Sequence, residues 1–297
     1  NLERDSKSAA VVEGYIPTTR ALQVLRRMAS TLTVNSMPRA WSLVGPYGSG
    51  KSSFGVFLPH LLGGSDTQAI KAREVLADYD QALANEISEC LKDGPGYLPV
   101  LLTGAPEPLS ARLTSALADA AQTFWGKRRG RSPAIVTQLS DGAGQSATTT
   151  KLLELVSALQ DALSRANCPG LVIVIDELGK FLEYEARHYG ANDIFLLQVL
   201  AEKAYEGNSA NLLIFVLMHQ AFEQYAKGLG QSLKNEWAKV QGRFENIPFL
   251  EASEQVLRVV SAAFSSSFST AQQKEIAKHT GHIVKQLATT NALPSAM

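Results

Sequence analysis

The chain has 297 residues, of which 45% are hydrophobic, enough for one large domain or a domain with a small appendage. Acidic and basic residues balance at 28 each, so net charge gives no overall attraction to nucleic acid or to an anionic membrane. No apolar run reaches the roughly 18 residues that span a bilayer, and no signal peptide is apparent. Cys90 and Cys168 lie far apart without metal-type spacing. We therefore expect a cytoplasmic protein with reduced thiols and no membrane partner.

The first quarter of the chain predicts a helix, a strand, a glycine-rich loop and a second helix. Pro17 and Thr18 mark the start of the first helix. An apolar run ending at Val44 predicts the first strand. The second helix would begin in the polar residues after the glycines. Its apolar face carries Phe54, Phe57, Leu58 and Leu61.

The glycine-rich loop fits the phosphate-binding pattern G-x-x-x-x-G-K-[ST] in its strand–loop–helix context. Its glycines let backbone N–H groups turn toward a phosphate chain at a helix N-terminus. Lys51 would reach the β- and γ-phosphates of ATP, and the Ser52 hydroxyl would complete the shell of a Mg²⁺ ion. The candidate nucleotide-binding residues are Gly45, Pro46, Tyr47, Gly48, Ser49, Gly50, Lys51, Ser52 and Ser53.

The middle of the chain predicts helices around two buried strands. Asp66 would cap a long helix that continues to about Leu91, and residues 98–103 and 171–175 read as strands. Between these strands, residues 105–170 predict a helical insert with a loop at 140–150 that is rich in small polar residues. A basic cluster in the insert is a candidate nucleic-acid contact, although a solvated turn is the favoured interpretation. The cluster comprises Lys127, Arg128, Arg129 and Arg131.

The last third predicts a helix at 192–206, a strand at 212–218 and a short strand at 247–250. Near-continuous apolar strands separated by helices imply an α/β fold with a parallel sheet flanked by helices on both faces. Helical patterns at 251–264 and 270–288 indicate a small C-terminal helical lid. We therefore expect a nucleotide-binding domain over residues 1–250 and a lid over 251–297.

Two acids follow the apolar strand at 171–175. This places the carboxylates of Asp176 and Glu177 at the carboxyl end of a buried strand, where open α/β sheets bind ligands. Asp176 suits Mg²⁺ binding through its water shell. Glu177 suits a general base, or a residue that orients the water, for attack on the γ-phosphate.

Two further positions could act on the γ-phosphate. His219 and Gln220 follow the fourth strand, and either one could contact the γ-phosphate or hold the attacking water; a helix-capping role is equally open. Arg243, just before the fifth strand, could contact the nucleotide of a neighbouring subunit. A guanidinium can stabilise the negative charge that develops on the phosphate during phosphoryl transfer. The alternative for Arg243 is a structural helix-end residue.

This order of parts resembles the AAA+ superfamily of P-loop ATPases over nearly the whole chain. The resemblance implies that the segment containing Tyr15 and Ile16 lies over the adenine. More narrowly, the residues from Ile175 to Glu183 and from Trp237 to Phe249 look like the ATPase module of large bacterial phage-defence proteins of the BREX type. The lid departs from the family pattern, because Arg258 is the only arginine after residue 251 and it comes early.

The resemblance implies Mg²⁺-dependent ATP binding and hydrolysis that drives conformational change in a homo-oligomer or a larger complex. Nucleic acid would then be contacted through other domains or through the basic cluster at 127–131. One alternative is an ATP-gated switch or scaffold that hydrolyses ATP poorly. A second alternative is a P-loop small-molecule kinase. Glu177 argues against it, because an acid that activates water would hydrolyse ATP instead of transferring its phosphate to an acceptor.

Overall fold

The computed structural model describes residues 2–33, 39–91, 94–128, 130–188, 193–206, 210–225, 231–262 and 268–289. The chain divides into two compact units, Asn1–Glu251 and Ala252–Met297.

The first unit is built on a five-stranded sheet whose order is β2-β3-β4-β1-β5. All four neighbouring pairs are parallel. Every residue of β3 is buried, as are all residues of β4 after the first, which accounts for their near-continuous apolar sequences. The strands are β1 (Ala40–Val44), β2 (Leu98–Thr103), β3 (Gly170–Asp176), β4 (Asn211–Met218) and β5 (Glu245–Pro248).

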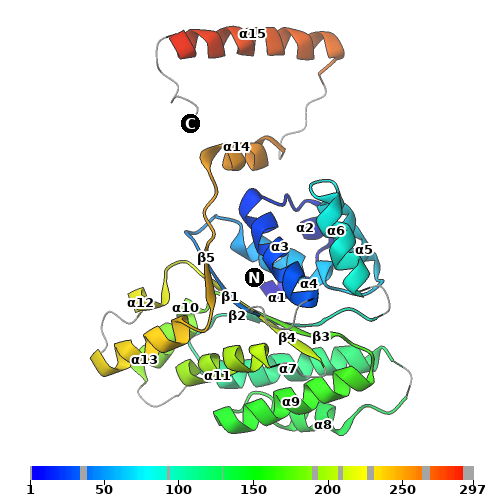
Figure 1. The fold of residues 1–297 in the computed structure, drawn as a ribbon, viewed down its shortest axis with the longest axis vertical. Coiled ribbons are helices and arrows are strands. Elements are labelled where there is room, and N and C mark those ends of the chain that lie inside the picture. The colour runs from blue at the N-terminus through cyan, green and yellow to red at the C-terminus, as the bar shows by residue number, and fades with distance from the viewer. Residues whose placement is uncertain are drawn as a thin grey trace. The chain divides into compact units, whose positions relative to one another are not determined.

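Helices cover both faces of this sheet (Figure 1), which confirms the predicted α/β class. One face is covered by α1 (Leu2–Asp5), α2 (Ala9–Glu13), α3 (Thr19–Thr33), α4 (Lys51–Leu61), α5 (Thr67–Ala77) and α6 (Gln81–Leu91). The other face is covered by α7 (Leu109–Gly126), α8 (Ala134–Asp141), α9 (Thr149–Arg165), α10 (Gly179–Arg187), α11 (Asp193–Tyr205), α12 (Phe222–Tyr225) and α13 (Gln231–Gln241).

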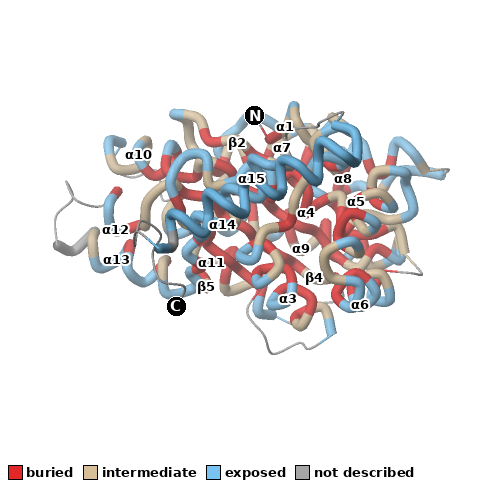
Figure 2. The backbone as a smooth tube through the Cα atoms, turned by 90° about the horizontal axis from the view of Figure 1, so that it is seen from above, coloured by how far each residue is buried: buried red, intermediate tan, exposed pale blue. Residues whose placement is uncertain are grey.

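The sheet separates two hydrophobic cores, and side chains of β3 alternate between them. Ile173 and Ile175 pack with α7 to α13, whereas Val172 and Val174 pack with α1 to α6. The buried residues of the first unit lie along its strands and on parts of the helices that cover them (Figure 2). The segment expected as an insert at 105–170 therefore forms α7, α8 and α9, which belong to the covering layer of the sheet.

Several predicted boundaries were wrong. The helix expected to run from Asp66 to Leu91 is two helices, α5 and α6, although Asp66 does cap α5 by accepting from Ala69 N at 3.0 Å. Asp80 starts α6, because its Oδ1 accepts a hydrogen bond from Leu83 N at 3.1 Å. The fifth strand begins two residues earlier than predicted, α8 ends inside the expected loop, and α10 was not anticipated.

The second unit contains α14 (Ser253–Ala262) and α15 (Thr270–Thr289). Both helices carry exposed apolar side chains, among them Val256, Leu257, Val260, Ile276, Ile283 and Val284. Among the described residues of the whole chain, no helix is long and apolar enough to cross a membrane.

Replacement of Asp80 by alanine tests the break between α5 and α6. Asp80 caps α6 and forms an ion pair with Arg26 at 2.8 Å, and these bonds hold the pKa of its carboxyl below the usual range. We expect Asp80→Ala to lower the free energy of unfolding by about 1 kcal/mol at pH 7. Because the folded-state pKa is lowered, this difference should be full above the unfolded-state value of about 3.9 and should disappear as the pH falls through the lower folded-state value.

Urea unfolding of both proteins from pH 7 downward measures this difference. Asp78→Ala, which changes an exposed carboxylate two residues away, is the matched control and should shift stability by less than about 0.5 kcal/mol. Equal losses in the two variants would contradict the capping role.

Candidate functional site

The phosphate-type loop joins β1 to α4 in a conformation that requires glycine. Gly48 and Gly50 have φ angles of 78° and 86°, in the left-handed region that other residues rarely adopt. At Gly45, any side chain would place its Cβ 2.3 Å from the carbonyl oxygen of Phe249. The Gly45 N–H also donates to Met218 O at 3.1 Å, so the loop is fixed against the end of β4. The fold is an α/β P-loop NTPase fold.

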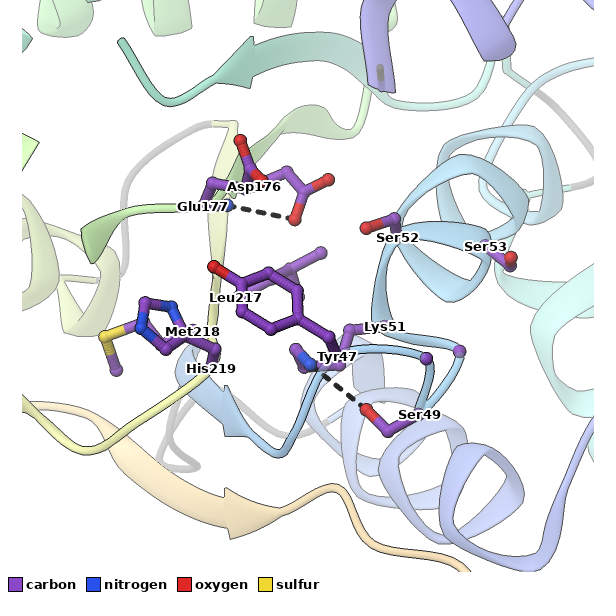
Figure 3. A pocket seen from close by; sticks show the side chains of 12 residues that line it. Tyr47, Ser49, Lys51, Ser52, Ser53, Asp176, Glu177, Leu217, Met218 and His219 are labelled. Atoms are coloured by element: carbon purple, nitrogen blue, oxygen red, sulfur yellow. Dashed lines mark hydrogen bonds between the residues drawn. The ribbon is translucent and has the colours of Figure 1, made fainter. Parts of the chain in front are cut away.

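The loop forms one side of an open cleft of about 250 Å³ at the carboxyl edge of the sheet (Figure 3). Residues from the ends of β3 and β4 form the other side. The cleft is lined by Tyr47, Gly48, Ser49, Gly50, Lys51, Ser52, Ser53, Asp176, Glu177, Leu217, Met218 and His219. A cleft of this volume is smaller than typical pockets for whole ligands, which hold about 300–1,000 Å³. It matches the polyphosphate part of a nucleotide better than the whole molecule.

Lys51 is 8% exposed, and its ammonium is held by the loop itself. Nζ donates to Gly45 O at 2.6 Å, to Pro46 O at 2.8 Å and to Ser49 Oγ at 3.0 Å. Burial lowers the pKa of Lys51, and the nearby Asp176 carboxylate partly opposes this effect. A phosphate oxygen beside Nζ would favour the charged ammonium more strongly than these neutral acceptors do.

Asp176 and Ser52 line the same cleft, and the Ser52 hydroxyl points toward the Asp176 carboxylate (Figure 3). Burial raises the pKa of Asp176. The nearby Ser52 hydroxyl and a hydrogen bond from Glu177 N at 2.9 Å oppose that rise. Hard oxygen donors beside a phosphate-binding loop are the ligands that Mg²⁺ prefers. These residues therefore fit a Mg²⁺ ion.

Glu177 has an unusual backbone conformation at the end of β3. Its φ of 52° is in the left-handed region, which is uncommon for a non-glycine residue. Its carbonyl oxygen lies so close to Gly104 that a Cβ there would be 2.1 Å away. The Glu177 carboxylate accepts a hydrogen bond from Lys180 Nζ at 2.5 Å, and this bond raises the pKa of Lys180. The Glu177 carboxylate therefore lines the cleft as part of an ion pair with Lys180.

The structure separates the two candidates that follow β4. His219 lines the cleft, and its ring stacks on Tyr47 of the loop with centroids 5.0 Å apart. Gln220 does not line the cleft; its backbone and its side chain lie near Tyr225 and partly oppose the rise that burial causes in the Tyr225 pKa. Of the two residues, His219 is the one that the fold brings to the cleft.

Arg243 lies in the turn between α13 and β5 and does not line the cleft of its own chain. Its Nε donates to Glu202 Oε1 on α11 at 2.8 Å, and both side chains are about half exposed.

The structure does not bring Tyr15 or Ile16 into the cleft either. The ring of Tyr15 stacks on Phe57 with centroids 4.3 Å apart, and burial raises its pKa. In the basic cluster, Arg128 lies over the Phe124 ring at 3.4 Å and donates to Phe124 O at 2.7 Å. Arg129 lies outside the described residues.

Lys180 and Tyr225 are the site residues that sequence reasoning missed. Lys180 could have been found, because it stands three residues after Glu177, the spacing of ion pairs on a helix. For Tyr225 the sequence holds no local signal, since its contacts to His219 and Gly179 depend on how α12 packs.

Among known proteins, similarity to this chain is found in solved structures alone. No family model matches the chain, and no curated protein matches it in sequence. One similar solved structure is the Aeropyrum pernix ORC2 protein in ADPNP–ADP complexes, with 16% sequence identity and a TM-score of 0.47. The match covers 83% of this chain and 53% of that one, so this chain spans about half the length of the ORC2 chain.

Replacement of Lys51 by alanine tests whether the loop holds phosphate. Lys51 supplies the only ammonium among the residues that line the cleft. We expect ATP affinity to fall by roughly tenfold to a hundredfold, as for loss of a charge-assisted hydrogen bond worth about 1.5–3 kcal/mol. Isothermal titration with ATP measures the change.

The matched control for that experiment is Lys71→Ala, which removes a surface lysine paired with Glu74 at 3.2 Å. The control should bind ATP as the wild type does. Equal affinity of Lys51→Ala and the wild type would contradict phosphate binding by this loop.

Proposed function

We propose that this chain is an AAA+-like, Mg²⁺-dependent ATPase module that drives conformational change in a larger assembly. The observation that carries the proposal is the convergence of three strand ends on one cleft. The phosphate-type loop follows β1, the acids Asp176 and Glu177 end β3, and His219 follows β4, which lies between them. This combines a phosphate-binding loop, a cation site and a general base within one site.

Each residue would have a distinct role in hydrolysis. The N–H groups at the start of α4 and the Lys51 ammonium bind the β- and γ-phosphates. Ser52 and Asp176 would hold Mg²⁺, which supplies charge neutralisation for the phosphates. Glu177 accepts the proton of the attacking water, and His219 contacts the γ-phosphate. Catalysis on this proposal is positioning and electrostatic stabilisation, without a covalent intermediate.

The nucleoside would extend out of the phosphate cleft toward the segment of Tyr15 and Ile16. Because the Tyr15 ring is already stacked on Phe57, the backbone of that segment would contact the base. The Thr18 hydroxyl and the backbone N–H of Arg20 donate to Glu251, which fixes this segment to the last residue of the first unit. The second unit, which follows Glu251, would serve as the lid.

The proposed assembly is a homo-oligomer or a subunit of a larger cytoplasmic complex, in line with the free thiols of Cys90 and Cys168. Arg243 supports an oligomer, since it does not line its own cleft and its ion pair with Glu202 is half exposed and worth about 0–1 kcal/mol. The motifs that resemble BREX-type ATPases make a bacterial phage-defence protein the proposed context. Contact with nucleic acid would then be made by other parts of the assembly, because Arg128 is engaged with Phe124.

A second candidate function is an ATP-gated switch that hydrolyses ATP poorly. The ion pair between Glu177 and Lys180 favours it, because the carboxylate that would take a proton from water already accepts a hydrogen bond from an ammonium. A small-molecule kinase is disfavoured by the same carboxylate, which would direct phosphoryl transfer to water. Steady-state phosphate release with and without DNA, RNA or candidate acceptors distinguishes these functions.

Replacement of Glu177 by glutamine tests the proposed hydrolysis. The amide keeps the size of the side chain and removes its basicity, so we expect unchanged ATP affinity and a fall in turnover of roughly a hundredfold or more. Phosphate release under saturating ATP and Mg²⁺ measures the change. Glu183→Gln, an exposed carboxylate on α10, is the control and should retain wild-type turnover. Retained turnover in Glu177→Gln would instead assign the base to another residue.

Replacement of Arg243 by alanine tests the proposed oligomer. ATP binding by the isolated chain should stay intact, and turnover should fall by up to roughly a thousandfold under conditions in which subunits assemble. A mixture of Arg243→Ala and Glu177→Gln chains should recover activity, because each chain supplies what the other lacks. Arg165→Ala, an exposed arginine in the last turn of α9, is the control. If the mixture assembles without recovering activity, Arg243 is a structural residue.

A further inference from the structure

The two acids that follow β3 line the same cleft, although an extended strand would turn them to opposite sides. Adjacent side chains of a β-strand point to opposite faces of the sheet. Asp176 is the last residue of β3 and Glu177 is the next residue, yet both line the cleft (Figure 3). The alternation of side chains along β3 therefore ends between them, at the backbone of Glu177.

Glu177 ends this alternation because its backbone lies in the left-handed region, with a φ of 52°. Among the described residues, Asn167 is the other non-glycine residue with a positive φ. The short polar side chain of asparagine can hydrogen-bond locally and tolerates this region, whereas a longer side chain there costs free energy. The conformation of Glu177 is thus strained, and it persists because the surrounding structure holds it.

Gly104 holds the Glu177 peptide from the side of β2. Thr103 pairs with Asp176 at the end of the β2–β3 ladder, and the N–H of the next residue, Gly104, donates to Asp176 O at 2.8 Å. This brings Gly104 against the Glu177 peptide, where a Cβ at position 104 would lie 2.1 Å from Glu177 O and 2.9 Å from Glu177 C. Both are backbone atoms, so rotation of a side chain could not relieve the overlap. The close approach therefore requires glycine at position 104.

The same turn is fixed on its other side by α10 and β4. Glu177 O accepts a hydrogen bond from Lys180 N at 3.0 Å, and Leu178 N donates to Leu217 O at 3.2 Å. The Glu177 carbonyl therefore cannot move away from β2 without disturbing these bonds. A side chain at position 104 would have to displace the whole turn, and with it the Glu177 carboxylate.

We propose that Gly104 is a positioning residue for Glu177. Because Gly104 has no side chain, the Glu177 turn packs against the end of β2 in the conformation that brings its carboxylate to the cleft of Asp176. This inference rests on the proposed function in one respect: Glu177 is taken to act in hydrolysis. The left-handed turn does not depend on that role, so it is tested separately.

Two variants that both remove the carboxylate, Glu177→Ala and Glu177→Gly, test the strain. Alanine keeps the cost of the left-handed region and glycine does not, although glycine loses more backbone entropy on folding. In urea unfolding, we expect the ratio of folded to unfolded protein to be roughly twofold to tenfold higher for Glu177→Gly. The matched pair is Glu183→Ala and Glu183→Gly within helix α10, where alanine should be the more stable. The same order at both positions, with alanine more stable, overturns the inference.

The variant Gly104→Ala tests the position of the carboxylate. We expect turnover at saturating ATP to fall by roughly tenfold to a hundredfold, as for a small displacement of a catalytic group, with the KM for ATP unchanged. In a Glu177→Gln background, Gly104→Ala should cause no further loss, because the carboxylate is already absent. Gly126→Ala is the matched control and should keep wild-type turnover, since a Cβ there would lie more than 4 Å from the other described segments of the chain.

The outcomes separate this inference from the proposed function. Wild-type turnover in Gly104→Ala, with turnover lost in Glu177→Gln, overturns the inference and leaves the proposed function intact. An equal further loss in the Glu177→Gln background would mean that Gly104 acts on folding alone, which also overturns it. Retained turnover in Glu177→Gln contradicts the proposed role of Glu177 instead. The urea comparison at position 177 needs neither hydrolysis nor a folded Gly104→Ala variant, so it tests the strained turn in every case.

Discussion

The parallel pairing of β1, β4 and β3 is the constraint on which the site depends. Val44 at the end of β1 pairs with Met218 at the end of β4, and Ile175 of β3 pairs with Val216. Beyond the strands, Leu178 N donates to Leu217 O at 3.2 Å, which continues the alignment past the two acids. A shift of one residue in either pairing would turn the strand side chains to the opposite faces and would separate the loop from the acids. The two cores prevent such a shift, since each face of β3 is completely buried.

Burial destabilises the charged forms of two side chains in the cleft, and this favours the binding of ligands of opposite charge. Burial lowers the pKa of Lys51 and raises the pKa of Asp176, so both charged forms are destabilised by desolvation. A phosphate beside Lys51 and a cation beside Asp176 would each restore the charged form. The free energy of holding two desolvated charges in place is therefore recovered when an anion and a cation bind together, as Mg²⁺–ATP would. Perturbed pairs of this kind are typical of functional sites.

The first residues of α10 contact both the Glu177 carboxylate and Tyr225, the neighbour of His219. Gly179 lies two residues after Glu177 and beneath the Tyr225 hydroxyl, while Lys180 holds the Glu177 carboxylate. A small movement of this helix start would therefore change the pairing of the proposed base and the environment of the imidazole together. The ion pair is half exposed and worth about 0–1 kcal/mol, so nucleotide binding is sufficient to replace it. This gives the ATPase and the switch proposals a common structural basis.

The sequence by itself determined the sheet, the loop and the two acids. Uninterrupted apolar runs are diagnostic of buried parallel strands, and a phosphate loop needs glycine, lysine and serine at fixed spacing, as at residues 45–52. These features are local, so they can be read from consecutive residues. The break between α5 and α6 was missed, because an apolar stripe continues across it and the decision rests on the Asp80 cap and its distant partner Arg26.

Only the tertiary structure shows which of His219 and Gln220 lines the cleft. Both are polar residues at the end of the same strand, so the sequence does not distinguish them, and they differ in what packs beside them. The same is true of the partners Lys180 and Tyr225, and of Tyr15, whose ring is stacked on Phe57 away from the cleft. These contacts join residues through the packing of α10 and α12 and of the N-terminal segment. Spacing along the chain encodes which chemical groups are present, whereas their mutual orientation depends on side chains brought together from separate elements.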